Sequence, residues 1–395
     1  MANTTGGGGG GGVSSSSSSS IFRLLPHTPS MNNIKVLLLL LINVLFHAAY
    51  GDVPALFVLG DSTVDVGTNT LLPNCTVRAD FPNNGIDFPN STPTGRFSNG
   101  FNLADFIARN MGHKLSPAPF LFLESRKHGL RKGARKGVNF ASSGSGLLDV
   151  TGSTFGVLPL SEQMKQFVAL YYNVSAVNGE AWLQNLLSKS FFCFSTGSND
   201  IFWYFANNYT TPEHEFVGLM LQEFRTAIET LYSLGARKFG IVGVSPVGCC
   251  PVKRLLNDTL GCFQPMNHFA KTFNSQLLSL MLDLSSELED IQYAFGDVYQ
   301  MTIDSMKYPA FYNFNNVEAA CCGHGVLNAE GLCNSTANVC LDHKDHVFWD
   351  LYHASEAAAE KEALNLFAGP KEYGIPINFA TLLHQTAPQV MVRTD

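Results

Sequence analysis

Four polar residues, far apart in the chain, have the types that serine acyl-transfer chemistry needs. Ser62 directly follows the apolar run LFVLGD and supplies a hydroxyl nucleophile. Near the other end of the chain, Asp350 and His353 stand three residues apart and supply a carboxylate and an imidazole. Asn199, in the run TGSND, offers an amide donor. Such chemistry requires a nucleophile, a base, a group that orients the base and donors for an oxyanion, and each has a candidate here.

The segments around these candidates alternate between strand and helix patterns. Short apolar runs end in small or polar residues and predict strands at 55–60, 136–143, 238–246 and 291–299. The segment 191–200 is predicted to be an apolar strand that ends in a polar loop. Amphipathic runs predict helices at 97–112, 160–172, 181–189, 216–234 and 267–290. This alternation predicts an α/β fold, in which a mainly parallel sheet is covered by helices on both faces. The loops that follow Leu59, Phe140, Phe194 and Val244 should then gather on one rim, where such folds bind ligands.

Eight short motifs, in order along the chain, resemble those of the plant GDSL esterase/lipase family within the SGNH hydrolases. They are GDST at 60–63, GRFSNG at 95–100, VNFASSGSG at 138–146, GSND at 197–200, LGARKF at 234–239, GCCP at 248–251, CCGHG at 321–325 and FWDLYHASEA at 348–357. One motif alone would be weak evidence, but eight in sequence are specific. The resemblance covers nearly all of 52–395 and implies a three-layer α/β/α sandwich of flavodoxin-like type.

The resemblance also implies roles for individual residues. Ser62 would be the nucleophile, His353 the general base and then the acid, and Asp350 the group that orients the imidazole. Gly146 would give a backbone N–H to the oxyanion hole and Asn199 its side-chain amide. The implied activity is hydrolysis of carboxylic esters through an acyl-serine intermediate, in lipid or acyl-ester metabolism. Neither a cofactor nor a metal ion is implied.

Three residues depart from the family pattern. Thr63 replaces the Leu of the family's name, and we assign it no chemical role. Ser143 stands where glycine or alanine is common, which leaves Gly144 open beside Gly146 as the oxyanion donor. Ala354 replaces a proline that would stiffen the loop after the histidine.

The first 51 residues predict export from the cell. Residues 1–30 form a Gly/Ser-rich leader, and 31–51 have the order of a secretory signal peptide, with Met31 as an alternative start to Met1. A membrane anchor is the rival reading of that apolar run. The remainder, 52–395, shows no break in composition and predicts a single domain. We therefore expect an extracellular protein of the apoplast or cell wall, with N-glycan acceptors at Asn74, Asn90, Asn173, Asn208, Asn257 and Asn334.

All nine cysteines follow Gly51, so an oxidising compartment would pair most of them. Cys193 lies in an apolar run and is expected to be a buried free thiol. A bridge to Cys262 could start from Cys249 or Cys250. Two further bridges are expected among the late cysteines, with connectivity left open: Cys321, Cys322, Cys333 and Cys340.

Charge limits the class of partner. The net charge of −7 argues against a nucleic-acid partner. The resemblance implies an ester substrate. The basic run Arg126–Lys136 is expected to be a solvated loop, with weak contact with anionic surfaces as the sharper hypothesis. The histidines and aspartates of 342–346 lack the spacing of a zinc-protease helix and favour a solvated segment over a metal site.

Two other functions fit the same sequence. An acyltransferase would use the same site with an alcohol as acceptor. A non-catalytic secreted glycoprotein that binds lipid or wall polymer would instead carry a broken set of site residues, and here the set is complete.

Overall fold

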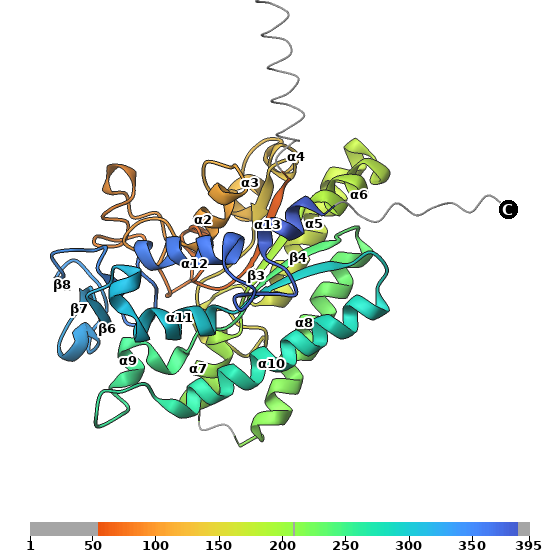
Figure 1. Cartoon of the computed structure of the whole chain (residues 1–395). Coiled ribbons are helices and arrows are strands. Elements are labelled where there is room, and N and C mark those ends of the chain that lie inside the picture. The colour runs from red at the N-terminus through yellow and green to blue at the C-terminus, as the bar shows by residue number, and fades with distance from the viewer. Residues whose placement is uncertain (1–53, 208–209, 386–395) are drawn as a thin grey trace, which may run out of the picture. The chain divides into compact units, whose positions relative to one another are not determined.

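A six-stranded sheet runs through the computed structural model, which describes residues 54–207 and 210–385 (Figure 1). The strand order is β10-β5-β4-β3-β1-β2, and only β10 runs antiparallel to its neighbour. The order of the five parallel strands is that of doubly wound flavodoxin-like sheets, so the predicted fold class is confirmed. The strands are β1 (Leu56–Gly60), β2 (Gly137–Asn139), β3 (Phe191–Ser195), β4 (Lys238–Val242), β5 (Gln292–Gly296) and β10 (Gly374–Ile375).

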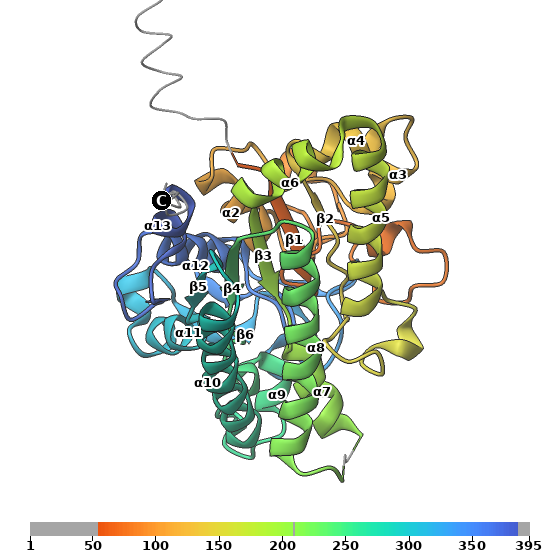
Figure 2. The same ribbon diagram turned by 90° about the vertical axis from the view of Figure 1, so that its right-hand side faces the viewer.

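Alternate residues of each strand enter different hydrophobic clusters, because successive side chains point to opposite faces of a sheet. Phe57 and Leu59 of β1 pack into one cluster, and Leu56 and Val58 into the other. The first face is covered by α3 (Phe120–Glu124), α4 (Gly129–Ala134), α5 (Leu160–Asn178), α6 (Glu180–Lys189), α7 (Ser198–Ala206), α8 (Glu213–Ser233) and α10 (Gln264–Glu287). The second face is covered by α2 (Leu103–Asn110), α11 (Val298–Lys307), α12 (Glu356–Ala368) and α13 (Phe379–His384), as Figure 2 shows from the side.

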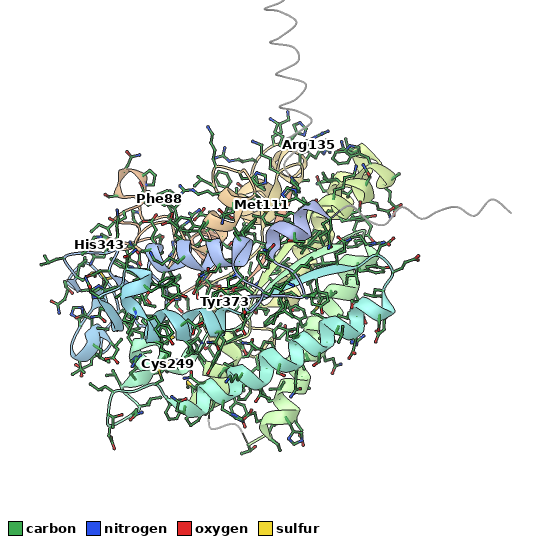
Figure 3. The ribbon with its side chains drawn as sticks, in the orientation of Figure 1. Phe88, Met111, Arg135, Cys249, His343 and Tyr373 are labelled. Carbon is green, nitrogen blue, oxygen red and sulfur yellow. A yellow bond between two sulfur atoms is a disulfide. The ribbon has the colours of Figure 1, made fainter. Side chains whose placement is uncertain are left out.

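A disulfide-rich segment lies between the last long helices and carries two small sheets. In one, β6 (Asn316–Ala320) pairs with β9 (His346–Phe348), and in the other β7 (Cys322–Gly323) pairs with β8 (Asn338–Val339). The bridges are Cys249–Cys262, Cys321–Cys340 and Cys322–Cys333, and Cys249 is labelled in Figure 3. Cys193 is buried and free, as expected. The short elements outside the sheets are α9 (Pro251–Arg254) and 3-10 turns at Asn69–Leu71, Pro89–Ser91, Ser153–Phe155, Val247–Cys249, Pro309–Tyr312 and Val326–Asn328.

Three sequence-based expectations need correction. The helix predicted over 97–112 begins only at Leu103, because the Asn102 side chain caps it and forms a capping box with Asp105. The segment after Ser195 was expected to be a polar loop, but α7 begins there at Ser198. The basic run is not a simple solvated loop, since α4 lies within it and buries Leu130 beneath the exposed cations.

Several expectations concern residues outside the described ranges. The leader 1–30, the signal peptide 31–51 and the sequon at Asn208 fall there, and they stay predictions, as does the domain bound 52–395. No helix of the described ranges is long and apolar enough to cross a membrane. Of the other five sequons, Asn257 is half-buried and four are exposed: Asn74, Asn90, Asn173 and Asn334.

Candidate active site

Ser62 stands at the carboxyl end of β1, after a turn that only glycine can make. Gly60 has φ +149°, and a Cβ there would lie 2.0 Å from the backbone oxygen of Ser195. Gln163 holds this turn from both sides: Gly60 N–H donates to its Oε1, and its Nε2 donates to Gly60 O, both at 2.9 Å. Asp61 N–H donates to Ser195 O at 3.0 Å. These bonds place Ser62 on the rim of the sheet with its side chain 8% exposed.

The structure brings Ser62, His353 and Asp350 into one chain of hydrogen bonds. His353 Nε2 lies 2.8 Å from Ser62 Oγ, and its Nδ1 lies 2.8 and 2.9 Å from the two carboxylate oxygens of Asp350. Asp350 Oδ1 also accepts the backbone N–H groups of Tyr352 and His353 at 2.9 Å. The Phe97 ring packs 4.7 Å from the imidazole, centroid to centroid. An imidazole held in this way can take the serine proton and return it to a leaving group.

Electrostatics favour the ionised form of Asp350. Its burial opposes ionisation, but the charge of His353 and the hydrogen bonds from His353 and two backbone N–H groups outweigh that effect. Together they hold the pKa of Asp350 below its ordinary value. A carboxylate that stays charged can fix the imidazole tautomer and stabilise the imidazolium.

Asn199 contacts the loop that carries Gly146. Asn199, in the first turn of α7, donates Nδ2 to Ser145 O at 2.9 Å, which leaves its second amide hydrogen available. Among the residues that the structure describes, the backbone N–H groups of Ser62 and Gly146 have no acceptor. A Cβ on Gly146 would lie 2.4 Å from a carboxylate oxygen of Asp200. Position 146 therefore requires glycine, because any side chain there would clash with Asp200.

Gly144 remains an alternative donor. It has φ +83°, and a Cβ there would meet Val77 only at an ordinary 3.4 Å. Its backbone N–H also lacks an acceptor within residues 54–207 and 210–385. The conformation of Gly144, rather than close packing, thus accounts for glycine at this position.

The loop that carries Gly146 is anchored by Asp200. The buried carboxylate accepts Leu147 N–H at 2.8 Å, Leu148 N–H at 3.1 Å and the Thr151 hydroxyl at 2.7 Å. Burial raises the pKa of Asp200 to about 6 against these hydrogen bonds. No local pattern could have indicated this role, because the partners lie about 50 residues away in sequence.

Thr63 likewise has a role that the sequence did not indicate. Its Oγ1 lies 2.7 Å from both Asp61 Oδ1 and Ser195 Oγ, which links the nucleophile turn to the end of β3. Burial raises the pKa of Asp61 to about 6, although the hydrogen bonds from Thr63 lower it. Ser143 has a comparable role, since its N–H and O–H both donate to the buried Asp65.

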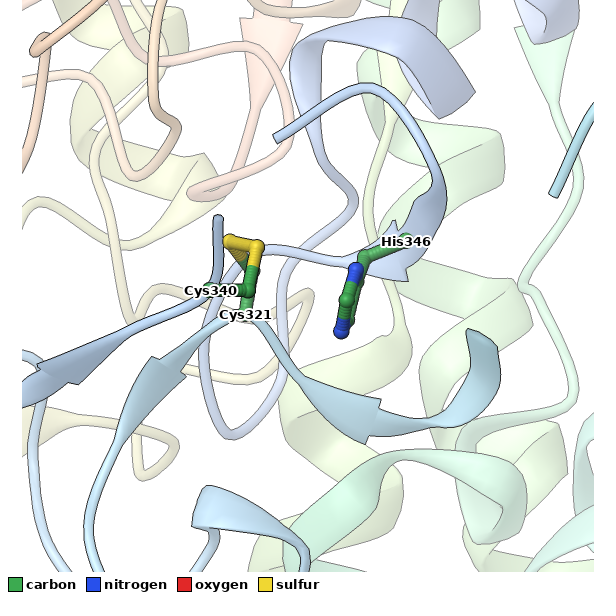
Figure 4. Close-up of side chains that lie close together, drawn as sticks. All are labelled: Cys321, Cys340 and His346. Carbon is green, nitrogen blue, oxygen red and sulfur yellow. A yellow bond between two sulfur atoms is a disulfide. The ribbon is translucent and has the colours of Figure 1, made fainter. Parts of the chain in front are cut away.

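One side-chain cluster of the described part of the chain has metal-ligand types, namely Cys321, Cys340 and His346 (Figure 4). The two sulfur atoms are joined in a disulfide, so they are not thiolate ligands in this state. The neighbouring His343 is not simply solvated, because its Nδ1 lies 2.7 Å from a carboxylate oxygen of Asp87.

A serine hydroxyl bonded to an imidazole that a buried carboxylate orients, on a flavodoxin-like sheet, has the design of a serine hydrolase site. The model of the family described as GDSL-like lipase/acylhydrolase matches residues 56–366. One GDSL esterase/lipase of Arabidopsis thaliana is 38% identical over 342 residues, which cover 84% of this chain and 90% of that protein. GDSL esterase/lipase 6 of the same plant is 36% identical over 358 residues, with 89% and 97% covered. The chain belongs to the GDSL-like lipase/acylhydrolase family, a family of carboxylic ester hydrolases.

Proposed function

We propose that this protein is a secreted esterase that hydrolyses carboxylic esters through an acyl intermediate on Ser62. The observation that carries the proposal is the continuous hydrogen-bond chain from Ser62 through His353 to Asp350. Family membership supports the class of reaction. The ester substrate is lipid, short acyl ester or acylated polysaccharide.

The proposed reaction has two halves with the same acid and base. His353 Nε2 removes the proton of Ser62 as Oγ attacks the ester carbonyl, and the imidazolium then protonates the leaving alcohol. Water next attacks the acyl-serine, again with His353 as base, and releases the acid and the free serine. Asp350 accepts from Nδ1 throughout and stabilises the imidazolium.

The oxyanion would be bound by three donors: Ser62 N–H, Gly146 N–H and Asn199 Nδ2. The free backbone N–H groups and the second amide hydrogen of Asn199 support this assignment. Because Asp200 holds the Gly146 loop and belongs to the same helix as Asn199, the loop and the amide are positioned by one element. Such preorganised donors contribute strongly to acyl transfer.

Export and glycosylation are part of the same proposal. Three disulfides and four exposed sequons support an oxidising, extracellular location, with 31–51 as signal peptide and 52–395 as the mature domain. Weak contact with anionic surfaces is proposed for Arg126–Lys136, which includes Arg135, labelled in Figure 3. The Arg135 guanidinium lies 4.8 Å from the centre of the Trp182 ring. Binding to anionic vesicles that does not fall with salt would exclude that contact.

The experiment is hydrolysis of p-nitrophenyl acetate, butyrate and palmitate by the secreted protein and by Ser62→Ala. We expect the variant to lose about 10³-fold or more in kcat/KM. Ser153→Ala, an exposed serine outside the site, is the matched control and should retain full activity. Equal activity in Ser62→Ala would refute the site. Product esters formed when a second alcohol is supplied would indicate the acyltransferase.

A further inference from the structure

A cavity of about 90 Å³ opens beside His353 at the carboxyl ends of β3 and β4, and we call it the His353 pocket. Thr63, Phe97 and Tyr352 line it together with the imidazole. Its apolar walls come from α2, β4, α11, β9 and α12, with the side chains of Leu103, Val242, Val298, Val347 and Phe348. Polar residues also line it near the ends of β3 and β4, among them Ser195, Thr196, Ser198 and Ser245. Neither Gly146 nor Asn199 lines it.

Glu362 of α12 is a carboxylate in the wall of this apolar pocket. In the described part of the chain it has no hydrogen-bond donor and no cation as a partner. Its neighbour Lys361 does not pair with it, because that ammonium lies 5.0 Å over the ring of Phe314. Burial without a partner raises the pKa of Glu362 to about 7.

A second polar group of the same wall also lacks a partner. Thr302 of α11 is 8% exposed, and its Oγ1 has no hydrogen-bond partner among the described residues. Thr302 and Glu362 both line the His353 pocket and a smaller cavity next to it. Glu362 is half-buried, whereas the Thr302 hydroxyl is buried. Buried polar groups are normally satisfied, so the unpartnered Thr302 hydroxyl beside the Glu362 carboxylate indicates a ligand that supplies the missing partner.

The position of the pocket indicates which part of an ester enters it. In the proposed reaction, His353 protonates the leaving alcohol, so the alcohol oxygen lies on the imidazole side of Ser62. The oxyanion donors lie outside the pocket wall. The alcohol part therefore faces the His353 pocket, while the carbonyl oxygen faces Gly146 and Asn199.

We infer that the His353 pocket binds the alcohol part of the ester, and that Glu362, assisted by Thr302, selects an alcohol that carries a cationic amino group. The inference rests on the proposed function for the orientation of the ester. A cation offsets the cost of an unpaired carboxylate in an apolar wall. The rings of Phe97 and Tyr352, which line the pocket, add cation–π attraction for an alkylated ammonium.

The test compares two esters of one shape that differ by a single charge, butyrylcholine and 3,3-dimethylbutyl butyrate. At pH 8, where Glu362 is ionised, we expect kcat/KM to favour the cationic ester by about tenfold or more. Glu362→Gln should lower kcat/KM for the cationic ester by about tenfold and change the neutral ester by less than about twofold. Thr302→Val should have a smaller effect of the same kind. Glu360→Gln, an exposed acid on the same helix, is the matched control and should behave as the wild type.

Two results would overturn the inference. One is a wild-type enzyme that hydrolyses both esters equally, and the other is a Glu362→Gln variant that loses both activities equally. Binding of free choline, followed by calorimetry, is a readout that needs no turnover, and it should disappear in Glu362→Gln. If choline binds but neither ester is hydrolysed, the proposed function fails while the cation site stands. If the neutral ester alone is hydrolysed and choline does not bind, the cation site fails while the proposed function stands.

Discussion

The two sides of the candidate site are held in different ways. On the nucleophile side, buried carboxylates fix the backbone: Asp61 holds the Thr63 turn, Asp65 holds Ser143, and Asp200 holds the loop of Gly146. On the base side, disulfides brace the segment that carries Asp350 and His353. Cys321 and Cys322 each form a disulfide, and their N–H groups donate to Phe348 O and Trp349 O just before Asp350.

Because the two sides are held differently, the geometry of one site should depend on both pH and redox conditions. Carboxylates respond to pH, so the nucleophile side should be sensitive to protonation. Disulfides respond to redox conditions, so the base side should be sensitive to reduction. The ring of Trp349, fully buried and bonded through Nε1 to Asn84, is the main apolar support of the base side.

The largest expected effect comes from Asp350→Asn. The variant keeps the size of the side chain but removes the charge that orients His353, and an amide favours the wrong imidazole tautomer. We expect kcat to fall about 10⁴-fold, as in other serine hydrolases with this change, while the melting temperature changes little. Steady-state kinetics of p-nitrophenyl butyrate hydrolysis measure kcat, and calorimetry measures the melting temperature. A loss below about tenfold would mean that Asp350 does not act through the imidazole.

On the nucleophile side, Asp200→Ala should have the largest effect on stability. It leaves two backbone N–H groups and the Thr151 hydroxyl without their acceptor in a buried site. We expect the free energy of unfolding to fall by about 3 kcal/mol or more, and activity to fall because the Gly146 loop loses its anchor. Denaturant titration measures the stability. The control is Asp283→Asn, which changes an exposed acid of α10. If Asp200→Ala lowered the free energy of unfolding as little as this control, the anchoring role of Asp200 would be contradicted.

On the base side, removal of the Cys321–Cys340 bridge should act more weakly and more locally. The double change to serine opens a loop of 19 residues and should cost about 3 kcal/mol of unfolding free energy. Activity should fall at elevated temperature, where the segment that carries His353 opens first. Removal of Cys249–Cys262 is the matched comparison, because that bridge does not tie the strands of the base side. Removal of Cys321–Cys340 should increase hydrogen exchange in 316–355 and leave exchange around Ser62 unchanged. A uniform increase would contradict the separate bracing of the nucleophile and base sides.

The sequence predicted the parts of this site that local patterns encode. Ser62 follows an apolar strand, and His353 stands three residues after Asp350, so both could be assigned from type and spacing together with the family motifs. The role of Asp200 and the pocket position of Glu362 could not be predicted. Both depend on contacts between segments far apart in the chain, and a helical pattern cannot distinguish an acid that faces a cavity from one that faces solvent.

The last expected effect is a dependence of stability on pH that belongs to the nucleophile side. The folded protein raises the pKa of Asp61 and Asp200 to about 6, so between about pH 4 and 6 the folded state binds protons that the unfolded state has released. The stability contributed by these acids is complete below about pH 4 and is lost as pH rises through 6. Each pKa is raised by about two units, so we expect the free energy of unfolding to fall by about 3 kcal/mol for each acid over this range. Asp61→Asn should reduce the slope, and loss of the Cys321–Cys340 bridge should leave it unchanged. A variant Asp61→Asn with the full slope would mean that this carboxyl is ionised throughout, and that hydrogen bonds from Thr63 outweigh its burial.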